Sequence, residues 1–207
     1  MSRFYVGVYS FCLALFGLLG YLAHQSFNFP GDIAIVLWLQ GVDLPFLKPV
    51  MQAISYIASL IPAIIIVALV TGGLLAAGGK LESIFIVSLT SCAAIINWLL
   101  KLLISRPRPG GGLVQVLGDN NGPSFPSGHV VYAVVFYGLL FYLASRLAKQ
   151  RAGVSVLRSL LILLIFLTGV SRIYLGAHWP SDVLGSLLLG GLLLTPTVVL
   201  YNKYARG

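Results

Sequence analysis

The stretch Ser-Arg-Ile-Tyr-Leu-Gly-Ala-His-Trp-Pro-Ser-Asp, residues 171–182, separates the last two apolar runs of the chain with an arginine, a histidine and an aspartate. Residues this polar are costly between membrane-length apolar runs. In a helix, Asp182 lies one turn beyond His178, where a carboxylate orients an imidazole and raises the basicity of its other nitrogen. The same residues are equally typical of a helix N-terminus, with Pro180 at an early helical position and Asp182 as a first-turn acid.

The composition around this stretch indicates an integral membrane protein. Of the 207 residues, 58% are hydrophobic and only 9% are charged, and the mean hydropathy is +0.98. At about 20 residues per spanning helix, this length suits a single membrane-embedded domain, residues 1–207. The formal charge of +8 is explained better by topology and anionic lipid than by nucleic acid. Cys12 and Cys92 lie inside apolar runs without metal-ligand spacing and are interpreted as packing residues.

The apolar runs predict an all-α, polytopic membrane protein with six transmembrane helices. Between the first two, short interfacial helices are expected in residues 28–49, with Asp32 and Asp43 as caps and Trp38 at headgroup level. Pro62 predicts a kink in the second span, and glycines at 185, 190 and 191 predict close helix packing in the sixth. The expected spans are 4–23, 50–77, 81–104, 126–144, 157–170 extending toward 174, and 182–201.

Six spans place both termini on one side of the membrane. The positive-inside rule makes that side cytoplasmic, because most basic residues fall on it: Arg3, Lys80, Arg146, Lys149, Arg151, Arg158, Lys203 and Arg206. A bacterial plasma (inner) membrane is the expected location. The remaining polar residues come from three distant segments and all fall at the outward, periplasmic or extracellular, ends: Lys101 and Arg108; Ser127, Gly128 and His129; Arg172, His178 and Asp182.

Together these outward residues are typical of a phosphate site. Three cations and the unpaired amides of a helix N-terminus, placed around two histidines, match a dianionic group with three oxygens. Only one carboxylate, Asp182, belongs to the set, whereas a magnesium site usually needs further oxygen ligands; Asp119 nearby is assigned to the loop. Taken singly, Lys101 is more typical of an interfacial lysine, Ser127 is consistent with an ordinary helix cap, and Arg106 and Arg108 are consistent with headgroup contacts. Their joint occurrence favours an enzyme.

These residues resemble the type 2 phosphatidic acid phosphatase (lipid phosphate phosphatase) superfamily, in its integral membrane branch. The family pattern has three parts, matched by Lys101 with Arg108-Pro109, by Pro126-Ser127-Gly128-His129, and by Ser171-Arg172 with His178 and Asp182. The motif-bearing core spans residues 97–185. Arg106 does not fit the family spacing from Lys101, so Arg108 is predicted to bind phosphate.

The resemblance implies a mechanism and a substrate class. His178 is expected to attack phosphorus and form a phosphohistidine, Asp182 to hold its other nitrogen, and His129 to protonate the leaving group and then activate water. The phosphate oxygens would be held by Lys101, Arg108, Ser127, Gly128 and Arg172. No metal or cofactor is expected, and no protein partner is inferred beyond membrane lipids.

The substrates that the resemblance implies are undecaprenyl diphosphate, phosphatidylglycerol phosphate and phosphatidic acid. A lipid-to-lipid phosphotransferase that uses the same site, and a non-catalytic lipid-phosphate transporter, remain alternatives.

Overall fold

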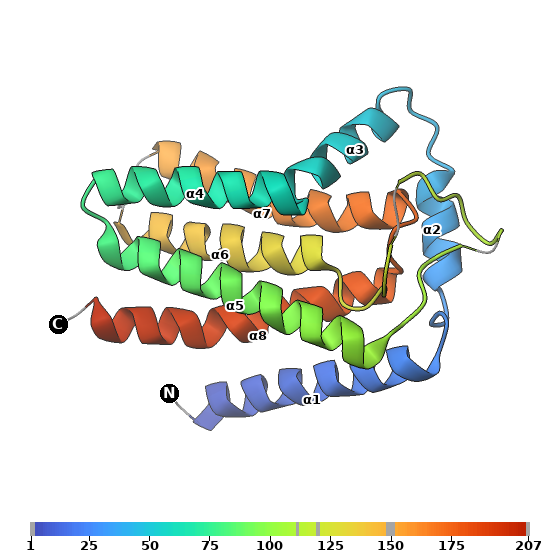
Figure 1. Ribbon diagram of the computed structural model, residues 1–207, viewed down its shortest axis with the longest axis horizontal. Coiled ribbons are helices and arrows are strands. Elements are labelled where there is room, and N and C mark those ends of the chain that lie inside the picture. Colours follow the sequence, from blue (N-terminus) through green and yellow to red (C-terminus); the bar gives the residue numbers. More distant parts are fainter. Residues whose placement is uncertain (1–2, 111, 119–120, 148–151, 206–207) are drawn as a thin grey trace.

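The computed structural model describes residues 3–110, 112–118, 121–147 and 152–205. In them the chain forms helices and no strand (Figure 1). The helices are α1 (Arg3–Gln25), α2 (Asp32–Gln40), α3 (Leu47–Ile57), α4 (Leu60–Ala76), α5 (Lys80–Ile104), α6 (Gly128–Leu147), α7 (Ala152–Tyr174) and α8 (Pro180–Tyr204). Asp119, Lys149, Arg151 and Arg206, which the sequence analysis used, lie outside the described residues.

Five of these helices, α1, α5, α6, α7 and α8, are long and apolar enough to cross a membrane. The pair α3 and α4 passes the same test together, with a bend of 60° between the two helices, and is the sixth candidate span. The predicted all-α fold with up to six spans is therefore confirmed.

The position of that bend corrects the prediction for the second span. The chain breaks at Ala58 and Ser59 rather than at Pro62, and the hydroxyl of Ser59 donates to the Tyr56 carbonyl at 2.7 Å. Pro62 falls in the first turn of α4. Amides in a first turn have no partner within the helix, so a proline is tolerated there without kinking it.

The segment between the first two spans holds one complete helix, α2. Neither aspartate acts as the predicted cap. The residue that precedes α2 is Gly31, in a left-handed conformation, and the one that precedes α3 is Phe46. Asp43 is exposed, whereas Asp32 is buried and turned toward the rest of the protein.

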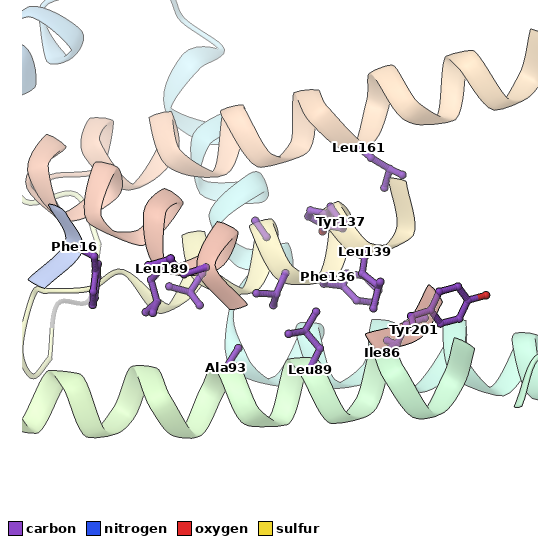
Figure 2. Packing of buried hydrophobic residues seen from close by; sticks show 14 of the residues in the cluster. Phe16, Ile86, Leu89, Ala93, Phe136, Tyr137, Leu139, Leu161, Leu189 and Tyr201 are labelled. Carbon is purple, nitrogen blue, oxygen red and sulfur yellow. The ribbon is translucent and has the colours of Figure 1, made fainter. Parts of the chain in front are cut away.

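Helix α6 lies at the centre of the bundle, with α5, α7 and α8 packed around it and α1 against α8 (Figure 1). The main apolar core fills the space between these helices. Figure 2 shows Leu89 of α5, Phe136 and Leu139 of α6 and Leu189 of α8 converging there. Half of the most apolar window of α6 is buried, a larger share than for any other candidate span. Because α6 is packed on several sides, the side chains of its first residues are held in fixed positions.

Two of the three glycines singled out in α8 make the close approaches that the sequence predicted. A side chain at Gly185 would collide with the ring of Phe125, and one at Gly190 with Val134 of α6. A Cβ at Gly191 would meet open space, so close packing was a wrong interpretation for that residue. The contact at Gly185 presses the α5–α6 loop against the first turns of α8.

The two ends of the bundle differ in what they carry. The start of α1, the end of α8 and the turn between α4 and α5 lie at one end (Figure 1). Helix α2, the described parts of the loop between α5 and α6, and the turn between α7 and α8 lie at the other. The three polar segments of the sequence analysis all reach this second end.

Candidate active site

The α5–α6 loop brings the first segment into place. Helix α5 ends at Ile104, the next residue, Ser105, has a left-handed backbone, and Pro107 and Pro109 prevent further helix. The amide of Ser124 donates to the carbonyl of Arg106 at 2.7 Å, which ties the start of the loop to its end. The loop therefore returns to the same end of the bundle with the start of α6 beside the end of α5.

His178 lies at the centre of the site and is only 1% exposed. Its Nε2 is 3.2 Å from Nη1 of Arg108, and its Nδ1 is 3.5 Å from Oδ2 of Asp182, four residues further along the chain. Burial holds the pKa of His178 well below its usual value, and the positive charges of Arg108 and Arg172 lower it further. The imidazole is thus neutral at physiological pH, and a neutral imidazole has one nitrogen with a free lone pair.

Asp182 has both roles that its sequence context suggested, as a first-turn acid of a helix and as a carboxylate beside His178. It lies in the first turn of α8 and its Oδ2 accepts the amide of Trp179 at 2.8 Å, as a first-turn acid does. The same oxygen accepts the hydroxyl of Ser124 and faces the imidazole of His178. A helix start is therefore used here to hold the carboxylate beside the histidine.

The three predicted cations surround His178 without carboxylate partners among the described residues. Arg108 donates to the carbonyls of Gly122 at 2.9 Å and Ala177 at 2.7 Å. Lys101 donates to the Pro123 carbonyl at 2.5 Å, and Arg172 donates to the hydroxyl of Ser55 in α3. Backbone carbonyls and a hydroxyl fix these positions but leave the positive charge unneutralised. Such a cluster favours an anion.

The start of α6 completes the cluster. Ser127 is fully buried and its Oγ has no hydrogen-bond partner among the described residues, while its amide donates to Ser186 at 2.7 Å. A Cβ at Gly128 would lie 3.2 Å from Nδ2 of Asn97, so a side chain there would crowd α5. His129 is close enough to Lys101, Arg108, Arg172 and His178 for their charges to act on it. All eight predicted site residues therefore meet at one end of the bundle.

Arg106 is not the headgroup contact that the sequence analysis offered as one interpretation of it. It is 1% exposed, and its guanidinium pairs with Asp182 Oδ1 at 2.5 Å and Asp32 Oδ2 at 3.1 Å. Sequence reasoning missed this pairing and the two serines that join it, Ser124 and Ser181. One signal was available in the sequence. An arginine that becomes buried needs a carboxylate partner, and with only five acidic residues in the chain the candidates for that partner are few.

A cavity of about 780 Å³ opens beside the site, between α4, α5 and α6. It follows α4 from Leu60 to Thr71 and α5 from Asn97 back to Val87, which is about 15 Å of helix. Its walls are mostly apolar, and its polar end is formed by Asn97, Gly128 and His129. We call this cavity the α4–α6 groove. Its length is close to the depth of one hydrocarbon leaflet, about 15 Å.

Within the described residues, no group of three or more His, Cys, Asp or Glu side chains is placed to hold a metal ion. The three cations that converge on the site, Lys101, Arg108 and Arg172, are hydrogen-bond donors rather than metal ligands.

The model of the PAP2 superfamily matches residues 82–206 of this chain. Phosphatidylglycerophosphatase B of Bacillus subtilis is 30% identical over 72% of this chain and 72% of its own length. A putative undecaprenyl-diphosphatase of Escherichia coli, YbjG, is 35% identical, and human dolichyldiphosphatase 1 is 34% identical. The alignments cover 46% and 47% of this chain, and 44% of each of these two relatives.

Two crystal structures have a similar fold. The transmembrane PAP2-type phosphatidylglycerolphosphate phosphatase of Bacillus subtilis superimposes with a TM-score of 0.82 at 24% identity, over 94% of this chain and 96% of that one. Aquifex aeolicus LpxE gives a TM-score of 0.68 at 21% identity, over 83% and 97%.

Proposed function

The chain belongs to the PAP2 superfamily, and on this premise we propose that it is a membrane enzyme that hydrolyses a lipid phosphate or diphosphate. The observation that carries the proposal is the neutral, buried His178 among three cations that lack carboxylate partners in the described residues. Names of relatives agree with it, since they include a phosphatidylglycerophosphatase and a putative undecaprenyl-diphosphatase.

In the first step, Nε2 of His178 attacks phosphorus. The new P–N bond forms as the P–O bond to the lipid breaks, and His129, protonated once the phosphate dianion offsets the surrounding positive charge, donates its proton to the departing oxygen. In the structure Arg108 Nη1 lies 3.2 Å from Nε2 of His178. When substrate is bound, it donates to a phosphate oxygen instead. Asp182 stabilises the positive charge on the phosphorylated imidazole.

In the second step, His129 removes a proton from water, and the water oxygen attacks phosphorus. The P–N bond breaks, phosphate leaves, and His178 becomes neutral again. In both steps the phosphate oxygens are held by the side chains of Lys101, Arg108 and Arg172, the Oγ of Ser127 and the amide of Gly128. Because these donors meet the phosphate charge, we propose that no metal is needed.

The α4–α6 groove supports a lipid as the carrier of the phosphate. It begins at His129 and continues between spanning helices, so a phosphate at His178 can leave its hydrocarbon chain in the bilayer. Undecaprenyl diphosphate, phosphatidylglycerol phosphate and phosphatidic acid all carry a phosphate group at one end and hydrocarbon chains at the other. We propose that the whole chain acts as one domain in a bacterial inner membrane, with both termini cytoplasmic and the site facing outward, because the described basic residues Arg3, Lys80 and Lys203 favour the opposite end.

We expect the purified protein in detergent to release inorganic phosphate from these three lipids, to keep its activity in EDTA, and to be inhibited by orthovanadate. Phosphate release is measured across the panel with and without the chelator. Loss of activity in EDTA that magnesium restores would contradict the metal-free mechanism. Labelled phosphate that appears on a second lipid would identify a phosphotransferase, and binding without any release would identify a carrier.

We expect Ala94→Trp, which places an indole in the α4–α6 groove, to raise KM for a long-chain lipid phosphate about tenfold, since overfilling a packed site costs about 1–3 kcal/mol. Hydrolysis of a short, water-soluble phosphate ester should change little. Cys92→Trp is the matched control, because Cys92 is exposed on the same helix and does not line the groove. Equal effects of Ala94→Trp on the long and short substrates would rule out the groove as the tail site.

A further inference from the structure

A buried network of charges lies behind the site and involves no residue of the three family motifs except Asp182. Arg106 bridges two carboxylates, with Nη1 2.5 Å from Oδ1 of Asp182 and Nη2 3.1 Å from Oδ2 of Asp32. Ser181 joins them, since its hydroxyl accepts from Arg106 at 2.8 Å and donates to Asp32 at 2.6 Å. The exposed fractions are 1% for Arg106, 3% for Asp32 and 0% for Asp182.

Asp32 is held in this network by more than the arginine. It is the first residue of α2, and its carboxylate accepts the amide of Phe29 at 2.8 Å and that of Ser181 at 2.9 Å. With Arg106 and the Ser181 hydroxyl, this makes four donors on one carboxylate. Four donors in fixed directions leave it little freedom to rotate, so Asp32 is a firm support for the guanidinium.

The guanidinium in turn helps to fix which oxygen of Asp182 faces the histidine, together with the Trp179 amide and the Ser124 hydroxyl that bind Oδ2. Arg106 binds Oδ1, so Oδ2 is the oxygen left toward Nδ1 of His178, at 3.5 Å. The arginine is also fixed from another side, because its guanidinium carbon lies 4.7 Å from the centre of the Phe29 ring. Asp32, Arg106, Asp182 and His178 thus form a chain of contacts that ends at the reactive ring.

Removal of the charge of Asp32 changes the balance within this chain. A buried arginine needs compensating negative charge, and among the described residues Asp182 would then be its only carboxylate partner. We expect Asp182 to be drawn more tightly toward Arg106 and to hold His178 less well.

We propose that Asp32, acting through Arg106, is a positioning residue that sets the orientation of Asp182 and hence of the His178 imidazole. It contacts neither the imidazole nor the cations of the phosphate site, so it should affect the chemical step and leave substrate binding nearly unchanged. The effect on turnover rests on the proposed phosphatase function, whereas the effect on the imidazole does not.

The test compares Asp32→Asn with Asp43→Asn, the same chemical change at the exposed aspartate of the same segment. For Asp32→Asn we expect kcat to fall about 10- to 100-fold, as for other groups that orient a reactive side chain indirectly, with KM unchanged within about twofold. Asp43→Asn should match the wild type in both.

The second readout is the ¹⁵N NMR spectrum of the imidazoles, which is simple because the chain has only three histidines. The His178 signals are assigned by their loss in His178→Gln. We expect Asp32→Asn to move the His178 Nδ1 signal and Asp43→Asn to leave it in place. A fall in kcat without a change in this signal would indicate a merely structural role and overturn the proposal, as would an unchanged kcat.

If Asp32→Asn does not fold, Ser181→Ala tests whether this network positions the His178 imidazole. It removes the hydroxyl between Arg106 and Asp32 but keeps every charge, so we expect smaller changes in the same direction in kcat and in the His178 signal. No change in either would overturn the proposal. If the wild type hydrolysed no lipid phosphate and the His178 signal still moved in Asp32→Asn, the phosphatase assignment would fail and the positioning role would stand.

Discussion

His178→Gln is expected to abolish phosphate release, with kcat lowered by about 10⁵-fold or more, because loss of a covalent nucleophile removes the two-step pathway itself. The site holds a second imidazole, His129, but the proposed mechanism uses it as the acid and the base, and the other neighbours are poor nucleophiles. Lys101, Arg108 and Arg172 are cations, and the Asp182 carboxylate is bound by Arg106, Ser124 and the Trp179 amide. The folded protein should persist, since the side-chain nitrogens of His178 make few bonds in the free protein.

The intermediate gives a more direct measurement than the rate. With a lipid labelled at the phosphate, rapid quenching of the wild type at alkaline pH should trap a phosphorylated protein that loses its label in acid, as a P–N bond does. His178→Gln should carry no label. His24→Gln is the matched control, because His24 lies at the end of α1 with Nδ1 3.0 Å from the Ile104 carbonyl, and it has no role in the proposed chemistry. Label on the His178→Gln protein would mean that another residue attacks phosphorus.

The sequence predicted that the eight candidate site residues gather at one end of the bundle, because polar side chains are costly at the ends of apolar runs. A lysine, two arginines and two histidines at the ends of apolar runs indicate a functional site. The alternation of six spans across the membrane places all of them at the same end. The pairing of Arg106 with Asp32 was not predictable in the same way, because 74 positions separate the two residues. Local spacing suggested a headgroup contact for Arg106 and a helix cap for Asp32. Only the folded chain brings α2 against the start of α8.

The break between α3 and α4 has the same kind of explanation. Pro62 was the strongest local signal for a bend, but helix α3 packs on α7, where Met51 contacts the cluster of Tyr174 and Leu175 and Ser55 accepts from Arg172. The helix ends where those contacts end. The bend therefore follows from the packing of α3 on α7, and the hydrophobic periodicity of the sequence does not reveal that packing.

Asp182→Asn is expected to lower kcat by about 10⁴-fold, the cost of replacing the carboxylate behind a catalytic histidine by an amide. If the amide oxygen binds Arg106, the amide nitrogen faces His178 and donates to Nδ1, which moves the ring proton to Nε2 and removes the attacking lone pair. In the reverse orientation the amide nitrogen faces the buried guanidinium. Either way, the negative charge that stabilises the phosphorylated imidazole is lost.

Asp32→Asn is the matched comparison for this variant, since each substitution neutralises one of the two carboxylates on Arg106 and leaves the other. The two proteins should therefore fold to a similar extent, which their thermal unfolding midpoints in detergent will check. Rates are then measured at saturating lipid phosphate. Only Asp182 faces the imidazole, so its loss should cost at least about 100-fold more than that of Asp32. Equal losses would mean that the charge balance around Arg106, and not the contact of Asp182 with His178, limits turnover.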